Sequence, residues 1–212
     1  ILVSPWTAVI TLALIVGLRV ADPTFVERTR LTQFDSLIKS KPEEVIGVSV
    51  VNIDEKAIEK YGQFPFSRDI YGNIIRDLYR RNAGLVVFNV LTPDRDRMGR
   101  DNEYIQTLRQ YPTILPSVGS TTTRNTPRAP GSAVIGPFGL DAFITYPGLI
   151  ANIPVLENNA AGIGIVSTLP EVDGVNRRMP LVVTVDGKIY PALSLETLRV
   201  AAGDSTIQVK MF

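Results

Sequence analysis

The sequence contains no cysteine and no histidine. Without cysteine the chain can form no disulfide, no thiolate nucleophile and no cysteine-ligated zinc site. Without histidine it lacks the imidazole of Ser-His-Asp triads and the commonest ligand of transition metals. We therefore assign no catalytic residue, no metal ligand and no cofactor.

An excess of charge of one sign is also absent. The 212 residues include 22 basic and 21 acidic side chains, which gives a net charge of +1. This balance argues against nucleic acid as a partner, because such binding depends on clustered positive charge. The apolar content of 45% is typical of a folded chain. Its length suits one domain of roughly 150 to 200 residues with an appendage.

The first 18 residues carry no charged side chain. As a helix they would extend roughly 27 Å, close to the thickness of the hydrocarbon core of a bilayer. We therefore predict a transmembrane helix over residues 1–21, with a signal peptide or a buried core helix as alternatives. The chain starts at Ile1 without a preceding Met or basic residue. We thus expect further residues before it, and the orientation cannot be read from flanking charges.

Residues 22–40 have the pattern of an amphipathic, membrane-proximal helix, whose apolar face includes Leu31, Phe34 and Leu37. Residues 41–212 are predicted to form one α/β domain. Its first strand is the β-branched, nearly all-apolar run 45–53, which suits a strand covered on both faces. A helix around residues 70–79 and a strand at 85–91 would complete a βαβ unit with parallel strands.

The later elements continue this alternation and then change to an antiparallel hairpin. Asp186-Gly187 is a turn dipeptide between the strand at 179–185 and the segment that runs antiparallel to it. We expect a mixed, mostly parallel central sheet with flanking helices and an antiparallel C-terminal hairpin. The remaining predicted elements are a helix at 101–110, a strand at 113–118, an exposed loop at 119–131, strands at 160–168 and 179–185, and a closing helix at 192–202 that stops at Gly203.

Two partial motifs are weak. Gly162 and Gly164 begin a dinucleotide-binding pattern, but Ser167 stands where its third glycine would be. The stretch 94–99 resembles the start of a calcium loop, yet Met98 occupies an oxygen-ligand position. We interpret the stretch as a solvated loop.

Two groups of polar residues are candidates for a ligand-binding site or a structural polar network. In the first, Arg68 opens a helix, where a cation is electrostatically unfavourable, so we expect a specific acidic partner. Asp54 and Asp94 are the candidates, although helix capping is the favoured interpretation of Asp54. In the second, the turn at Asp173 leads to Arg177 and Arg178. An arginine fork suits a carboxylate of the protein or of a ligand.

The order of five short blocks resembles the type-two CHASE sensory domains, over essentially residues 33–202. The blocks are Phe34-Asp35-Ser36-Leu37, Val50-Val51-Asn52-Ile53-Asp54, Phe64-Pro65-Phe66-Ser67-Arg68, Phe88-Asn89-Val90-Leu91 and Asp173-Gly174-Val175-Asn176-Arg177-Arg178. The chain departs from the family pattern at Asn89, where aspartate is usual, and at Phe64 and Phe66, where tryptophan is usual. Glu171 also replaces an aspartate.

The resemblance implies an extracytoplasmic or periplasmic sensory domain of a bacterial receptor in the inner membrane. Such domains precede class III adenylate cyclases, histidine kinases and related effectors, so we expect an effector beyond Phe212, with adenylate cyclase as the leading candidate. We expect the lipid bilayer, a second copy in a homodimer and an unknown extracytoplasmic ligand or protein as partners. The alternative function is a membrane-anchored structural or interaction subunit without a signalling output.

Overall fold

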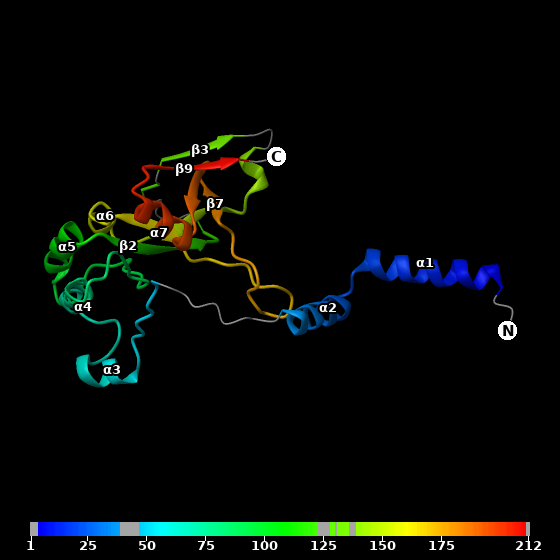
Figure 1. Ribbon diagram of the computed structural model, residues 1–212, viewed down its shortest axis with the longest axis horizontal. Helices are drawn as coiled ribbons and strands as arrows, with labels where there is room; N and C mark the ends of the chain where they lie inside the picture. The colour runs from blue at the N-terminus through cyan, green and yellow to red at the C-terminus, as the bar shows by residue number, and fades with distance from the viewer. Residues whose placement is uncertain (1–3, 39–46, 123–127, 130, 136–138, 211–212) are drawn as a thin grey trace. The chain divides into compact units, whose positions relative to one another are not determined.

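The computed structural model describes residues 4–38, 47–122, 128–129, 131–135 and 139–210. It is a mixed α/β protein, as the sequence predicts (Figure 1). The described chain divides into two compact units. The helical unit comprises residues 1–51 and 169–177, and the sheet unit comprises residues 52–168 and 178–212. The sheet unit is therefore interrupted in sequence by a short segment that belongs to the helical unit.

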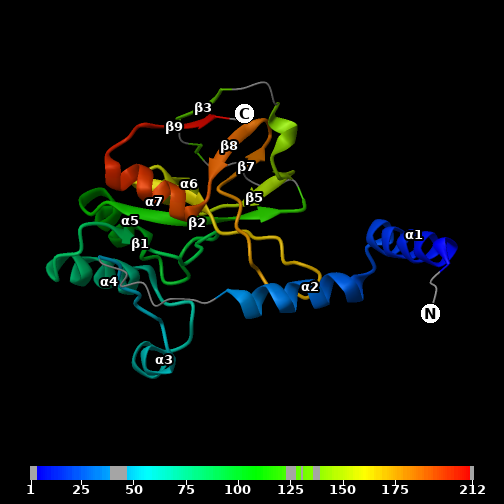
Figure 2. The ribbon, with the colours of Figure 1, turned by 45° about the vertical axis from the view of Figure 1, so that its right-hand side comes forward.

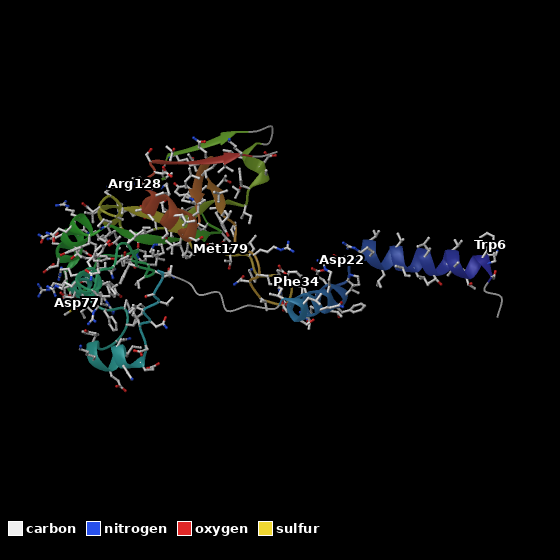
Figure 3. All side chains as sticks on the ribbon, in the orientation of Figure 1. Trp6, Asp22, Phe34, Asp77, Arg128 and Met179 are labelled. Atoms are coloured by element: carbon white, nitrogen blue, oxygen red, sulfur yellow. The ribbon has the colours of Figure 1, made fainter. Side chains whose placement is uncertain are left out.

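The helical unit contains two helices, α1 (Pro5–Ala21) and α2 (Thr24–Leu37). Ser4 caps α1 by accepting a hydrogen bond from the Trp6 backbone, and Pro5 occupies the first helical position, where proline is tolerated. No residue of α1 is buried, and Figure 3 shows its side chains projecting all around the helix. Only Leu31 is buried in α2. The predicted helix at 22–40 is thus present over 24–37, and residues 39 and 40 lie outside the described residues.

The predicted transmembrane helix is not confirmed. Among the described helices, none is by itself long and apolar enough to qualify as a membrane span. The pair α1 and α2 meets the length and composition requirement together, with a bend of 85° between them.

The main sheet of the sheet unit centres on β2 (Thr113–Ser120). β2 pairs in parallel with β1 (Val86–Val87) and with β6 (Gly162–Ile165), and antiparallel with β5 (Gly148–Ile150). Two smaller sheets accompany it. In one, β7 (Val182–Val185) pairs antiparallel with β8 (Lys188–Pro191) and parallel with β4 (Thr145–Tyr146), and in the other β3 (Gly131–Ile135) runs parallel to β9 (Thr206–Lys210).

Helices pack on both sides of β2 (Figure 2), with α7 (Leu193–Ala202) on one side and α4 (Arg68–Arg80) on the other. Next to α4 lies α5 (Asp101–Gln110), and the shorter helices are α3 (Glu55–Tyr61), α6 (Pro154–Glu157) and a 3₁₀ turn at Leu140–Ala142. One buried cluster joins α4, α5 and the parallel strands; its aromatic members are Phe66, Tyr71, Phe88 and Tyr104. A second cluster joins the hairpin of β7 and β8 to β5 and β6; its members include Leu149, Ile165 and Tyr190.

The predicted first strand is the main error. Residues 48–53 are assigned to no strand, and Val48, Val50 and Val51 are 69%, 81% and 63% exposed; residues 45 and 46 lie outside the described residues. β-branched residues form a strand only where another strand offers its peptide groups. Here the βαβ unit uses β1, α5 and β2, one step later in the chain than predicted.

Other elements match more closely. α4, α5 and α7 are present as predicted, and Gly203 ends α7 with a φ of 74°. Asp186 and Gly187 have φ of 49° and 69°, as a two-residue hairpin turn requires. The strand predicted at 85–91 shortens to β1. The supposed loop at 119–131 contains the end of β2 and the start of β3, and α7 is followed by β9.

Candidate functional site

The Arg177 cluster consists of Arg177 and three carboxylates from the helical unit, those of Asp35, Glu171 and Asp173. The guanidinium donates to both oxygens of Asp35, at 2.8 Å from Nε and 2.7 Å from Nη2. It also donates to both oxygens of Asp173, at 2.9 Å from Nη1 and 2.7 Å from Nη2. Glu171 lies at 3.5 Å from Nη1. Two bidentate pairs on one arginine make a strong and directional contact.

A tight turn at Asp173-Gly174 positions the arginine. Gly174 has a φ of 82°, in the region that glycine adopts without strain, and its backbone N–H donates to the Glu171 carbonyl at 2.8 Å. The Asp173 carboxylate also accepts from the Val175 backbone at 3.1 Å, as aspartates in turns commonly do. The turn therefore brings Glu171, Asp173 and Arg177 together on one short segment.

The charges of the cluster stabilise one another. Hydrogen bonds from Arg177 lower the pKa of Asp173 to about 2 and lower the pKa of Asp35. Hydrogen bonds to these two carboxylates raise the pKa of Arg177 further above its ordinary value. The arginine side chain is only 10% exposed, whereas that of Asp35 is 48% exposed. At neutral pH Arg177, Asp35 and Asp173 are thus all ionised.

The cluster fastens α2 to the segment 169–177. Asp35 belongs to α2 and the other three residues belong to the segment, 142 positions away from Asp35 in the case of Arg177. A second contact comes from Arg28 of α2, whose Nη2 donates to the Val172 carbonyl at 3.4 Å. Arg28, the buried Leu31 and Asp35 follow one another at intervals of three and four residues, so they share one face of α2.

Arg68, the arginine of the first predicted polar group, lies in the sheet unit. Arg68 is 6% exposed, and its Nη2 donates to the backbone carbonyl of Asp94 at 3.1 Å. The neighbouring carboxylate is that of Asp101, 3.7 Å from Nε. The guanidinium also lies over the Tyr71 ring, 5.6 Å from its centroid. Arg68 therefore has Asp94 as a partner through its carbonyl, and Asp101, which was not predicted, supplies the charge.

Asp54 caps a helix. Its Oδ1 accepts a hydrogen bond from the Ala57 backbone at 3.1 Å, at the start of α3. In the loop at 94–99, Asp96 accepts from the Arg100 backbone at 2.8 Å and from Ser67 at 3.3 Å. Within the described part of the chain, no group of three or more acidic residues could hold a metal ion.

The pair Gly162 and Gly164 serves packing. A Cβ added to Gly164 would lie 2.4 Å from the Cα of Leu193 in α7, and one added to Gly162 would lie 2.4 Å from Glu196 Oε1. Glu196 is 1% exposed and is paired with Arg199 at 2.7 Å. The glycines allow α7 to approach β6, which explains them without a nucleotide.

A protein-family model described as the CHASE2 domain matches residues 9–211, nearly the whole chain. The chain belongs to the CHASE2 domain family. CHASE2 domains are extracellular sensory domains of membrane receptors, so the resemblance of the sequence blocks is confirmed and the chain is a sensor domain for signal transduction. Searches among curated proteins and among solved structures gave no match.

Sequence reasoning missed three of the acidic residues that pair with the arginines of this CHASE2 domain. Asp35 lies in one of the sequence blocks and Glu171 beside another, but nothing in their spacing links either to Arg177. Asp101 opens α5 and resembles an ordinary N-terminal acidic residue. Arg178, predicted together with Arg177, has an exposed side chain and belongs to the sheet unit. Only the three-dimensional pairing identifies these carboxylates.

Proposed function

We propose that this CHASE2 domain is the extracytoplasmic input unit of a receptor that α1 tethers to the bacterial inner membrane. A stimulus received outside the membrane changes the arrangement of the domain, and α2 carries the change toward an intracellular effector. Adenylate cyclase is the effector that family association favours, and a homodimer is the assembly through which the helices act. A ligand shifts such an equilibrium only by its different affinities for the two arrangements.

The composition and exposure of α1 support the tether. The helix has 17 residues, all of them unburied, and Trp6 is 73% exposed near its start. Exposed apolar side chains around a whole helix are unfavourable in water and favourable in lipid. A tryptophan near one end suits the interface between lipid and water.

The Arg177 cluster is the observation that supports α2 as the transmitting helix. The segment 169–177 lies in the chain between β6, which ends at Ile165, and β7, which begins at Val182. Four side-chain hydrogen bonds shorter than 3 Å link Arg177 to Asp35 and Asp173, and two of these fix α2 to the segment. In this proposal, a movement of β6 or β7 is transmitted to α2 through the hydrogen bonds of the Arg177 cluster.

The test uses the full-length protein in native membranes. Arg177→Lys keeps the positive charge but removes the bidentate contacts, so we expect it to change effector output several-fold. Arg80→Lys is the matched control, since Arg80 pairs with Asp77 on the surface, with exposures of 75% and 62%. For the adenylate cyclase effector, the measured quantity is the conversion of ATP to cyclic AMP. Equal output from Arg177→Lys and wild type would overturn the role of the Arg177 cluster in transmission.

Two further measurements separate the receptor from an interaction subunit. The intact mass of the native product should lie far above the 23.2 kDa of this chain, because a receptor needs an output domain. A mass within a few kDa of that value would favour the membrane-anchored interaction subunit. Insertion of two glycines near Leu31 should uncouple the domain from its effector, and unchanged signalling would count against α2 as the transmitting helix.

A further inference from the structure

A buried polar network in the sheet unit is separate from both arginine sites. Its centre is Asn152, which is 1% exposed and follows β5. The Asn152 side chain accepts from the backbone and hydroxyl of Thr92, at 2.9 and 2.7 Å, and donates to the Pro116 carbonyl at 2.8 Å. One amide therefore holds together the chain after β1, the middle of β2 and the chain after β5.

Glu157, the last residue of α6, completes this network. Its Oε1 accepts from the Asn152 backbone at 3.1 Å, and the residue is 4% exposed. The carboxyl also interacts with the Asn152 side chain and with the backbone N–H and the guanidinium of Arg128. The charge of Glu157 contributes to the raised pKa of Tyr190 in β8. From α5, which packs against α6, Arg109 turns to Asn159, with 2.7 Å between Nε and Oδ1.

Protonation of Glu157 is linked to the arrangement of the three segments that Asn152 holds together. Burial disfavours the charged carboxylate and raises the pKa of Glu157 to about 7 from an ordinary 4.5. Between pH 4.5 and about 7, the buried Glu157 carboxyl is therefore protonated, whereas a carboxyl exposed to water is ionised. Acid stabilises the buried arrangement, and rising pH favours an arrangement in which the carboxylate reaches water.

We propose that the Glu157 network is a proton-binding stimulus site, and that this CHASE2 domain responds to the acidity of the space outside the membrane. The inference rests on the proposed receptor function and names its stimulus. With Glu157 protonated, α6 keeps the carboxyl against the Asn152 backbone. With Glu157 ionised, the carboxylate turns toward water and α6 shifts. The hydrogen bonds of Asn152 with Thr92 and Pro116 then weaken.

The first experiment measures thermal unfolding of the full chain in detergent between pH 4.5 and 8. Wild type should lose stability as the pH rises toward 7, and Glu157→Gln, which imitates the neutral acid, should lose this dependence. Glu59→Gln is the matched control, because Glu59 is exposed on α3; it should behave as wild type. An unchanged pH dependence in Glu157→Gln would overturn the proposal.

A second variant guards against a folding defect in the first. Arg128→Gln removes the positive charge that favours the ionised carboxylate, so the transition should move to higher pH. A transition that stays in place or moves to lower pH contradicts the assignment to Glu157.

The second experiment follows effector output of the full-length receptor from pH 5 to 8. Wild type should change its output several-fold with a midpoint near 7, and Glu157→Gln should stay at the acid level. An output that responds to Arg177→Lys but not to pH overturns the proton stimulus and leaves the receptor function standing. An output that responds to neither overturns both.

Discussion

At the scale of single residues, the packing of α7 against β6 depends on side-chain volume in β6 and on an ion pair in α7. β6 is buried throughout, and both of its glycines face α7 at distances that exclude a methyl group. The carboxylate of Glu196 fills the space above Gly162 and accepts from the Ile163 backbone at 3.3 Å. The packing of α7 on β6 therefore depends on two glycines, which have no side chain, and on one ion pair.

Gly164→Ala should destabilise the sheet unit by about 1–3 kcal/mol, the usual cost of forcing extra volume into a packed core. The reason is that the new Cβ would meet the Leu193 backbone, which cannot rotate away. Chemical denaturation of the full chain measures the change. Gly84→Ala is the control, since no atom lies within 4 Å of its added Cβ. Equal stability of the two variants would contradict the packing argument.

Arg199→Leu should destabilise the same unit more strongly, by about 3–5 kcal/mol, because it leaves a buried carboxylate without its partner. Glu196 is 1% exposed, so water cannot replace the guanidinium. The double variant Glu196→Gln with Arg199→Leu should recover much of the loss. If the double variant were less stable than the single one, the uncompensated charge would not be the cause.

At the scale of elements, short helices depend on their caps. α3 has seven residues and no buried residue, so it gains little from packing. Its first turn is held by the Asp54 carboxylate, which follows the exposed stretch 48–53. The same aspartate was a candidate ligand-binding residue, and the cap gives it a structural role.

Asp54→Ala should weaken α3 by about 1 kcal/mol, whereas Asp54→Asn keeps a side-chain acceptor and should cost less. Hydrogen exchange of the α3 amides measures both changes, with the α5 amides as an internal reference. Equal effects of Ala and Asn would show that the cap does not stabilise α3.

At the scale of the whole molecule, the two units should respond to pH with opposite signs. Asp173 has a lowered pKa of about 2 against an ordinary 3.8, so its stabilisation is full above 3.8 and is lost as pH falls toward 2. Glu157 has a raised pKa of about 7 against 4.5, so its stabilisation is full below 4.5 and is lost as pH rises through 7.

Hydrogen exchange, corrected for intrinsic rates, should therefore accelerate in α2 and residues 169–177 as pH falls from about 4 to about 2. Around α6 it should accelerate as pH rises from about 4.5 to about 7. These windows follow from the two pKa shifts. A change of the same sign in both regions would contradict the assignment of the two carboxyl groups.

Sequence patterns predicted the elements whose signals are local. The periodicity and stop signals of α4, α5 and α7 are contained within each helix, and the turn at Asp186 needs only its own dipeptide. β3, β5 and β9 carry no comparable local signal, because each is defined by a partner strand. The run 45–53 has the composition of a buried strand but lacks such a partner over residues 48–53.

The amino-acid sequence by itself determined the family, the α/β class, the main helices and the lack of histidine and cysteine chemistry, because these depend on composition and on short patterns. The tertiary structure decided which carboxylate faces each arginine, how closely α7 approaches β6 and how deeply Glu157 is buried. Those properties depend on distances between residues far apart in the chain, such as Asp35 and Arg177. Such distances exist only after the segments have packed together.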